Sequence, residues 1–193
     1  MAPRKATPKP RAGAAPKPAL GPTARYAAFL RGVYPNNCKM ADLAAAYAEA
    51  GLANPKTVAS SGNVLFDAPA GGDLAELEAR CEAATEAHLG RAFLTMVRPL
   101  DAIRKLVADD PFARLAPGAE GKRVVSFLRG PPPRGARFPV SRDGATIHGV
   151  VGRAAFTTYL PSPKGPVFMV LIEKTLGEVV TTRTWDMLTK LAR

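Results

Sequence analysis

The sequence predicts an α+β fold, and three observations lead to that prediction. Short apolar runs between turns marked by glycine, proline and asparagine are typical of buried strands. Longer segments in which bulky apolar residues recur at helical spacing are typical of amphipathic helices. Over residues 25–98 these segments follow one another as strand, helix, strand, strand, helix, strand. That is the order of a ferredoxin-like unit, in which two helices cover one face of an antiparallel sheet.

The first strand and the first helix are well marked. Residues 25–33 (RYAAFLRGV) are mostly apolar and end near a glycine before a polar turn, which favours a buried strand. In residues 39–51 the bulky apolar side chains share one helical face. Gly51 suits the left-handed residue that follows a helix, and Asn36 or Asn37 can cap its start.

The rest of the first half contains two strands, a helix and a final strand. Residues 56–69 predict two extended segments that meet near Ser60 to Asn63, at a hairpin turn or a bulge. Residues 73–89 predict the second helix, and residues 91–99 predict the fourth strand. We expect the acidic row of that helix to be its solvent face, because such rows usually are. The row consists of Glu78, Glu82 and Glu86.

The second half, residues 99–193, resembles a rearranged version of the first. It opens with a predicted helix over residues 100–110 and a turn or loop from Pro111. Three strand-like runs then predict an antiparallel meander, and a Pro/Gly-rich loop from Gly130 to Gly144 separates the first two. The runs are residues 122–130, 145–152 and 154–161. A helix near residues 167–177, a short extended segment and a last helix capped by Thr184 complete the chain.

Residues 1–24 form a basic tail with no acidic residue. The segment is rich in alanine, proline, lysine and arginine, so it cannot bury enough apolar area to offset its ordering entropy. We therefore expect it to be disordered. It is either an arm that contacts phosphate groups or a solubilising extension, and both interpretations stay open.

Composition excludes several classes of protein. The net charge of +11 favours polyanionic partners, such as nucleic acid. No apolar stretch is long enough for a membrane span, so we expect no membrane partner. The two cysteines, Cys38 and Cys81, are too few for a disulfide framework. With no signal peptide pattern at the N-terminus, these features predict a cytoplasmic protein.

Motifs for catalysis or cofactor binding are not recognisable. Gly121-Lys122 lacks the remaining residues of a phosphate-binding loop, and Ser60-Ser61-Gly62 lacks the glycines of a nucleophile elbow. The cysteines and histidines do not have the close spacing of metal ligands. We expect no metal and no cofactor.

Three stretches carry a family resemblance: residues 29–43, 60–66 (SSGNVLF) and 179–191 (VVTTRTWDMLTKL). Together they resemble the bacterial family known as domain of unknown function 1697, over residues 25–193. The resemblance implies two ferredoxin-like halves, residues 25–98 and 99–193, and it implies no settled activity, substrate or cofactor. The chain departs from the family in a shorter loop after the first strand and in Thr184, where relatives have asparagine.

Two functional hypotheses from different classes follow. In the first, the protein binds nucleic acid or another polyanion without sequence selectivity, through its tail and a basic surface of the second half. The candidate contacts are Lys5, Lys9, Arg11, Lys17, Lys122, Arg123, Arg129, Arg134, Arg137 and Arg142.

In the second hypothesis, a polar pocket binds a small anionic ligand, either as a binding protein or as an enzyme. The candidates lie at strand ends and turns, where the first and third strands of a ferredoxin-like sheet are neighbours. They are Arg31, Ser60, Ser61, Asn63, Arg183 and Thr184. The competing interpretation is structural: Arg31 pairs with an acid, Asn63 caps a turn, and Trp185 anchors the core.

Overall fold

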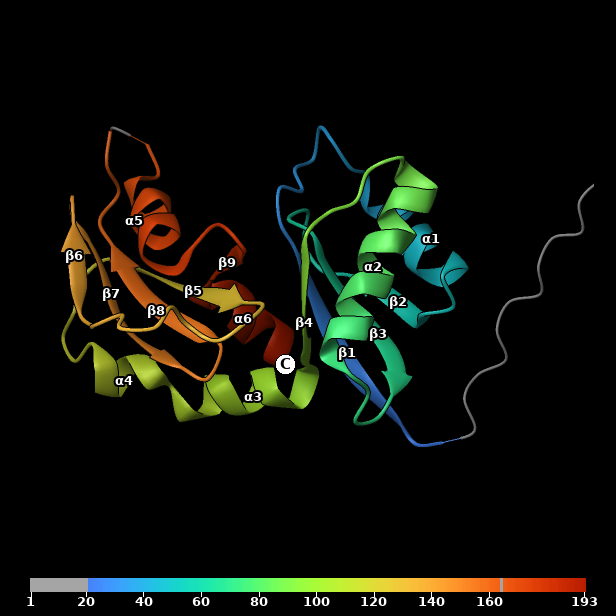
Figure 1. The fold of residues 1–193 in the computed structure, drawn as a ribbon, viewed down its shortest axis with the longest axis horizontal. Coiled ribbons are helices and arrows are strands. Elements are labelled where there is room, and N and C mark those ends of the chain that lie inside the picture. Colours follow the sequence, from blue (N-terminus) through green and yellow to red (C-terminus); the bar gives the residue numbers. More distant parts are fainter. Residues whose placement is uncertain (1–20, 164) are drawn as a thin grey trace, which may run out of the picture.

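The structure is a computed structural model that describes residues 21–163 and 165–193. Two antiparallel sheets lie side by side, and helices pack against both of them (Figure 1). The predicted tail contacts Lys5, Lys9, Arg11 and Lys17 lie outside the described residues. In the described part of the chain, no helix is both long and apolar enough to cross a membrane.

The first sheet has the predicted ferredoxin-like arrangement. Its strands stand in the order β2-β3-β1-β4, so the first and third strands are central neighbours as expected. Helices α1 and α2 cover one face, and their apolar side chains form a core with that face. The elements are β1 (Thr23–Leu30), α1 (Met40–Glu49), β2 (Ala53–Thr57), β3 (Asn63–Pro69), α2 (Leu74–Leu89) and β4 (Thr95–Pro99).

The N-terminal ends of α1 and α2 differ in how they are capped. Asp73 caps α2, because its carboxylate accepts a hydrogen bond from the Ala75 amide. The predicted cap of α1 by Asn36 or Asn37 is wrong, since Lys39 occupies the cap position without a side-chain bond. Asn37 instead stabilises the preceding loop, where its amide group donates to the Gly32 carbonyl at 2.8 Å.

The second sheet stands in the order β6-β7-β8-β5-β9. The predicted meander is wrong, because β5 pairs with β8 and not with β7. Strands β7, β8, β5 and β9 therefore repeat the spatial order of β2, β3, β1 and β4. The segment between β5 and β7 takes the place of a first helix and adds the edge strand β6. The strands are β5 (Lys122–Leu128), β6 (Val140–Arg142), β7 (Ala145–Val151), β8 (Ala154–Tyr159) and β9 (Val180–Thr184).

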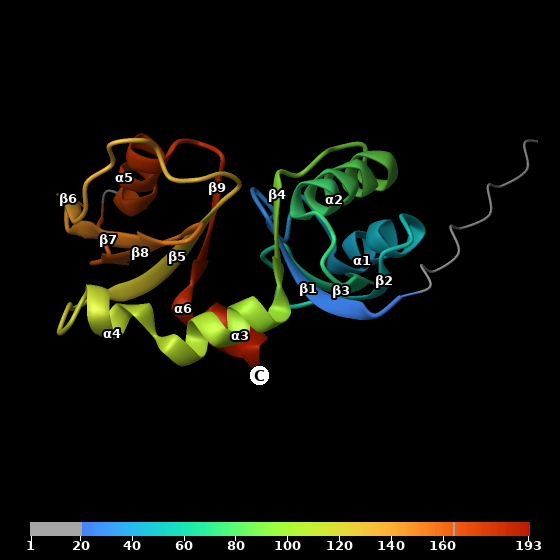
Figure 2. The ribbon, with the colours of Figure 1, turned by 60° about the horizontal axis from the view of Figure 1, so that its bottom comes forward.

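Helices cover both faces of the paired sheets. Helix α5 (Val167–Leu176) lies on the same side as α1 and α2, whereas α3 (Leu100–Asp109), α4 (Pro111–Leu115) and α6 (Trp185–Ala192) lie on the opposite side (Figure 2). The expected loop after Pro111 is in fact the short helix α4, which proline can begin because the first helical position needs no amide donor.

A shared core joins the two halves. It contains side chains from both sheets and from α3, α4 and α6. Phe29 of β1 stacks on Phe127 of β5, with ring centroids 4.6 Å apart. Trp185 is buried in the same cluster, packed edge-on against Phe112. The core places the end of β1 beside the start of β9, and this juxtaposition forms the groove described below.

The acidic row of α2 is not a solvent face, which corrects that expectation for two of its three members. Glu78 is buried and accepts a hydrogen bond from the Val97 amide at 3.0 Å, and Glu82 accepts one from the Thr95 amide at 2.9 Å. The two carboxylates thus satisfy amides of the edge strand β4. They also meet two arginines, Arg98 and Arg129, which neutralise their charge.

Candidate functional site

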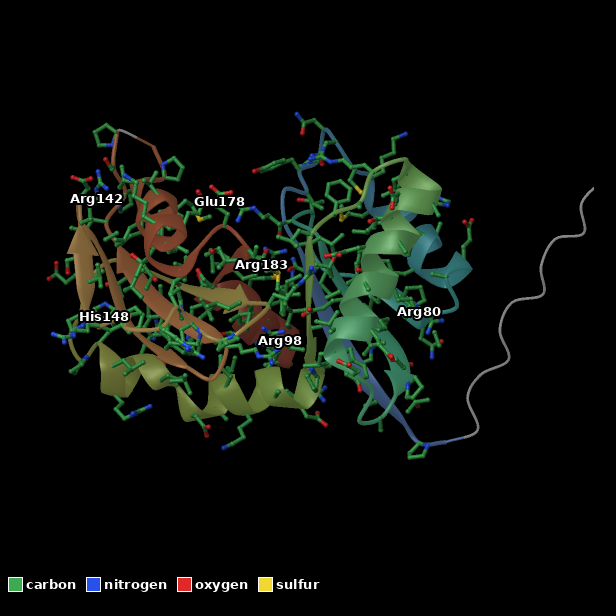
Figure 3. All side chains as sticks on the ribbon, in the orientation of Figure 1. Arg80, Arg98, Arg142, His148, Glu178 and Arg183 are labelled. Carbon is green, nitrogen blue, oxygen red and sulfur yellow. The ribbon has the colours of Figure 1, made fainter. Side chains whose placement is uncertain are left out.

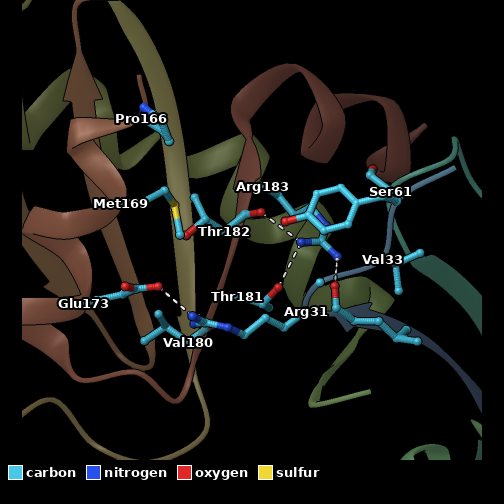
Figure 4. A pocket seen from close by; sticks show the side chains of 13 residues that line it. Arg31, Val33, Ser61, Pro166, Met169, Glu173, Val180, Thr181, Thr182 and Arg183 are labelled. Atoms are coloured by element: carbon cyan, nitrogen blue, oxygen red, sulfur yellow. Dashed lines mark hydrogen bonds and ion pairs between the residues drawn. The ribbon is translucent and has the colours of Figure 1, made fainter. Parts of the chain in front are cut away.

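A groove of about 510 Å³ lies between the two halves. Its wall on the first half comes from the loop after β1 and from the turn before β3. Its wall on the second half comes from α5, from Pro166 just before it, and from β9 (Figure 4). The volume lies within the usual range for small-molecule sites of about 300–1,000 Å³.

Arg31 crosses the groove from the first half to the second. Its Nη1 donates to the carbonyls of Glu178 at 2.7 Å and Val180 at 2.9 Å. Its Nη2 donates to the Glu173 carboxylate at 2.6 Å (Figure 4). Arginine has five N–H donors, so two remain without an acceptor among the described residues. The side chain is 33% exposed, which leaves the guanidinium accessible from the groove.

Arg183 lies under the groove with every donor used. Its Nη2 donates to the carbonyls of Leu30 at 2.7 Å and Gly62 at 3.0 Å, and its Nε donates to Asn63 Oδ1 at 2.5 Å. Its Nη1 donates to Thr181 Oγ1 and to the Thr182 carbonyl, both at 2.9 Å. These bonds connect β9 to the turns that flank β1 and β3.

The charge of Arg183 has no carboxylate partner among the described residues. Only 8% of the residue is exposed, and all five of its acceptors are neutral. Burial lowers the pKa of Arg183 to about 10, so the guanidinium stays protonated at neutral pH. The floor of the groove therefore carries a positive charge that the protein does not neutralise locally.

Asn63 and Gly62 shape the turn that receives Arg183. Asn63 is buried, and its amide group donates to the Val58 carbonyl and to Ser61 Oγ, both at 3.0 Å. Gly62 has a φ of +68°, and a Cβ at this position would come within 2.8 Å of the Val33 side chain. Only glycine fits both the left-handed conformation and the close packing at this point.

Of the six predicted pocket residues, the structure places three in the lining of the groove: Arg31, Ser61 and, as its buried floor, Arg183. Asn63 lies directly behind Arg183 and completes its hydrogen bonds. Ser60 is exposed outside the groove lining. Thr184 caps α6, since its hydroxyl accepts a hydrogen bond from the Met187 amide at 3.2 Å.

Other groove residues were not predicted from the sequence as part of a site. Glu173 sits on the mostly apolar helix α5, and Thr181 and Thr182 belong to the short strand β9. Tyr34, Pro166 and Met169 also line the groove, on opposite halves of the chain. They meet only because the two sheets pack together.

The predicted basic contacts of the second half divide into two groups. Three of them pair with carboxylates: Arg123 with Asp110 at 3.5 Å, Arg129 with Glu78 and Glu82, and Arg142 with Asp143 at 3.2 Å. The other three are exposed and have no ion pair within the described part of the chain. They are Lys122, Arg134 and Arg137.

Groups for metal or thiol chemistry are not assembled in the described residues. No group of three or more histidine, cysteine, aspartate or glutamate side chains converges there. Both cysteines are buried and free. Burial raises the pKa of the Cys81 thiol to about 12 and also raises that of Cys38, so neither is an activated nucleophile at neutral pH.

Comparison with known proteins supports the fold and the family. A family model described as "Protein of unknown function (DUF1697)" matches residues 23–154. The chain is also similar to a solved structure described as conserved bacterial protein SP0830 from Streptococcus pneumoniae. The TM-score is 0.62 at 15% identity, and the match covers 89% of this chain and 100% of that one. Such a likeness shows the shared α+β fold. A search of curated proteins found no match.

Proposed function

The chain belongs to the DUF1697 family, and we propose that this member binds a small organic anion in the groove between its two halves. The observation that carries the proposal is the buried, protonated Arg183 beneath the groove, which has no carboxylate partner in residues 21–163 and 165–193. A cation in a low-dielectric setting attracts an anion more strongly than one in water.

The charges that line the groove favour an anion. Two arginines, Arg31 and Arg183, face a single carboxylate, Glu173, so the lining carries a net positive charge. Arg31 offers the hydrogen bonds, because two of its donors are unused among the described residues. Arg183 supplies charge without direct contact, since its donors are all engaged. Planar guanidinium groups suit carboxylate and phosphate oxygens.

Glu173 occupies part of the place that an anion would take. Its carboxylate lies 2.6 Å from Arg31 Nη2, so a ligand must share this nitrogen or displace the glutamate. Both side chains are about one-third exposed, and ion pairs with such exposure are worth about 1 kcal/mol or less. A ligand with two negative charges can therefore compete with Glu173.

The variant Glu173→Gln is expected to bind inorganic phosphate about fivefold more tightly than the unmodified protein, because it removes one competing charge worth about 1 kcal/mol. Isothermal titration calorimetry measures the affinity. The matched control is Glu178→Gln. That residue lies just before β9 (Figure 3), and it meets Arg31 only through its backbone carbonyl. An equal gain in both variants would indicate long-range charge alone.

Arg31→Met provides the opposite test of the same site, with Arg114→Met as the control on the exposed side of α4. Loss of phosphate binding in the first variant alone supports the groove. Equal binding by all variants, or no binding by any of them, contradicts the proposal. Circular dichroism confirms that each variant is folded before titration.

We propose nucleic-acid binding as a second function, supported by Lys122, Arg134 and Arg137, which are exposed and form no ion pair with any residue that the structure describes. The double variant Arg134→Glu/Arg137→Glu is expected to weaken binding of single-stranded RNA about tenfold or more at low salt, because each phosphate contact contributes to affinity. Fluorescence anisotropy, with the full chain and with residues 1–24 deleted, separates the body from the tail. Arg114→Glu is the control. Unchanged affinity in the double variant of the truncated chain would contradict a surface on the fold.

We also propose a reducing, cytoplasmic location. Both cysteines are free and buried, and neither lies in a metal-binding group within the described residues. Free thiols of this kind are typical of reducing compartments.

A further inference from the structure

We propose that the anion in the groove carries a flat aromatic ring that stacks on Tyr34, which makes the ligand class that of mononucleotides and similar ring-bearing phosphates. The inference rests on the proposed anion binding at Arg31. It adds the part of the ligand that Arg31 does not contact.

Tyr34 is an exposed aromatic side chain at the groove. It is 62% exposed, the largest fraction among the exposed large hydrophobic side chains of the described residues. The other tyrosines with described positions are buried or half-buried. Tyr34 also lines the groove, together with Arg31, which precedes Tyr34 by three residues in the chain. An aromatic residue and an arginine therefore line one cavity.

The backbone around Tyr34 is held by several hydrogen bonds. The Tyr34 amide donates to Asn37 Oδ1 at 2.8 Å, and its carbonyl accepts from the amides of Asn37 at 3.1 Å and Cys38 at 3.2 Å. The Asn37 amide group also donates to the Gly32 carbonyl at 2.8 Å. The loop thus fixes the backbone of an exposed ring before any ligand arrives. Such preorganisation lowers the entropic cost of binding.

The wall of the groove on the second half of the chain includes apolar side chains. Pro166, just before α5, and Met169 of α5 contribute them (Figure 4). A thioether is polarisable and makes favourable contacts with aromatic rings. A ligand ring can therefore be covered by tyrosine on one side and by the α5 wall on the other. This arrangement suits a ring, whereas a simple inorganic anion would leave the apolar wall unused.

The test compares three probes by calorimetry with the full chain. Adenosine monophosphate has ring and phosphate, ribose 5-phosphate has phosphate without the ring, and adenosine has the ring without phosphate. We expect adenosine monophosphate to bind at least about fivefold more tightly than ribose 5-phosphate, because base stacking on an aromatic side chain commonly adds that much or more.

Tyr34→Ala is expected to abolish this preference while the affinity for ribose 5-phosphate stays the same. Tyr34→Phe is expected to keep the preference, since it retains the ring. Tyr34 is exposed, so neither variant removes a core contact. Equal affinity for the two phosphates, or a preference that survives Tyr34→Ala, overturns the stacking inference and leaves anion binding intact if Arg31→Met still abolishes it. No binding of either phosphate overturns the proposed function and the inference together.

Discussion

Replacing Arg183 with methionine is expected to lower the free energy of unfolding by about 3 kcal/mol or more. The guanidinium supplies donors to five acceptors, and three of them belong to the first half of the chain: the carbonyls of Leu30 and Gly62 and the side chain of Asn63. Each buried acceptor left without a donor costs about 1–3 kcal/mol. Methionine can fill much of the volume, but it cannot donate.

Urea unfolding followed by circular dichroism measures this loss. For a protein of this size, it corresponds to a fall in melting temperature of about 6 °C or more. Arg183→Lys keeps the charge but replaces the planar fork with a single ammonium group, so we expect an intermediate loss. Arg114→Met, on the exposed face of α4, is the matched control. A loss below about 1 kcal/mol in Arg183→Met would show that water replaces the guanidinium. It would contradict the expectation that the hydrogen bonds of Arg183 stabilise the contact between the two halves.

The second large effect is expected at Glu78. Its carboxylate meets Arg98 Nη1 at 3.4 Å and Arg129 Nε at 3.3 Å, and it accepts a hydrogen bond from the Val97 amide. Glu78→Ala leaves the buried Arg98, which is 9% exposed, without this partner. Breaking a buried ion pair costs about 3–5 kcal/mol, because the remaining charge is uncompensated.

Glu86→Ala is the control for this prediction, since Glu86 lies on the same row of α2 and is exposed. Denaturant unfolding of both variants gives the comparison. Similar small losses in the two variants would contradict the assignment of Glu78 to a buried cluster. Glu78→Gln retains the acceptor for Val97 but loses the charge, so its loss is expected to lie between those of Glu78→Ala and Glu86→Ala.

The hydrogen bonds of Arg183 and the charged cluster around Glu78 both join the two halves of the chain. Arg183 of β9 reaches turns of the first half, whereas Arg98 of β4 donates to the Leu128 carbonyl of the second (Figure 3). Arg129 follows β5 and reaches Glu82 on α2. The groove is therefore bounded by elements whose relative position is held by buried polar bonds, as a site with preset geometry requires.

The ferredoxin-like order of the first half could be predicted because its signals are local. Helical spacing within residues 39–51 and 73–89, and apolar runs at 25–33 and 91–99, depend on neighbours a few positions away. In the second half, β5, β7, β8 and β9 were predicted as strands, but β6 falls inside the predicted loop from Gly130 to Gly144, and the predicted strand order was wrong. Strand pairing depends on which partner buries which face, and sequence spacing does not specify that.

Only part of the candidate site could be predicted, because some of its residues have local signals and others depend on contacts between distant segments. Arg31, Ser61 and Arg183 lie at or near strand ends, and polar residues in such positions often belong to binding sites. Glu173 lies in a predicted helix that is mostly apolar, and nothing in the sequence marks it as a site residue, whereas the row that contains Glu78 predicts a solvent face. Their roles depend on arginines that are 142 and 20 residues away, respectively.

The sequence by itself determined the class of fold, the elements of the first half, the family and the positive charge of the chain, because composition and local periodicity encode them. Only the tertiary structure decided which charges remain free. It buries Arg183 among neutral acceptors, pairs Arg31 with Glu173 and leaves Tyr34 exposed beside them. Burial and pairing arise from contacts between distant segments, and these contacts exist only once the two sheets pack against each other.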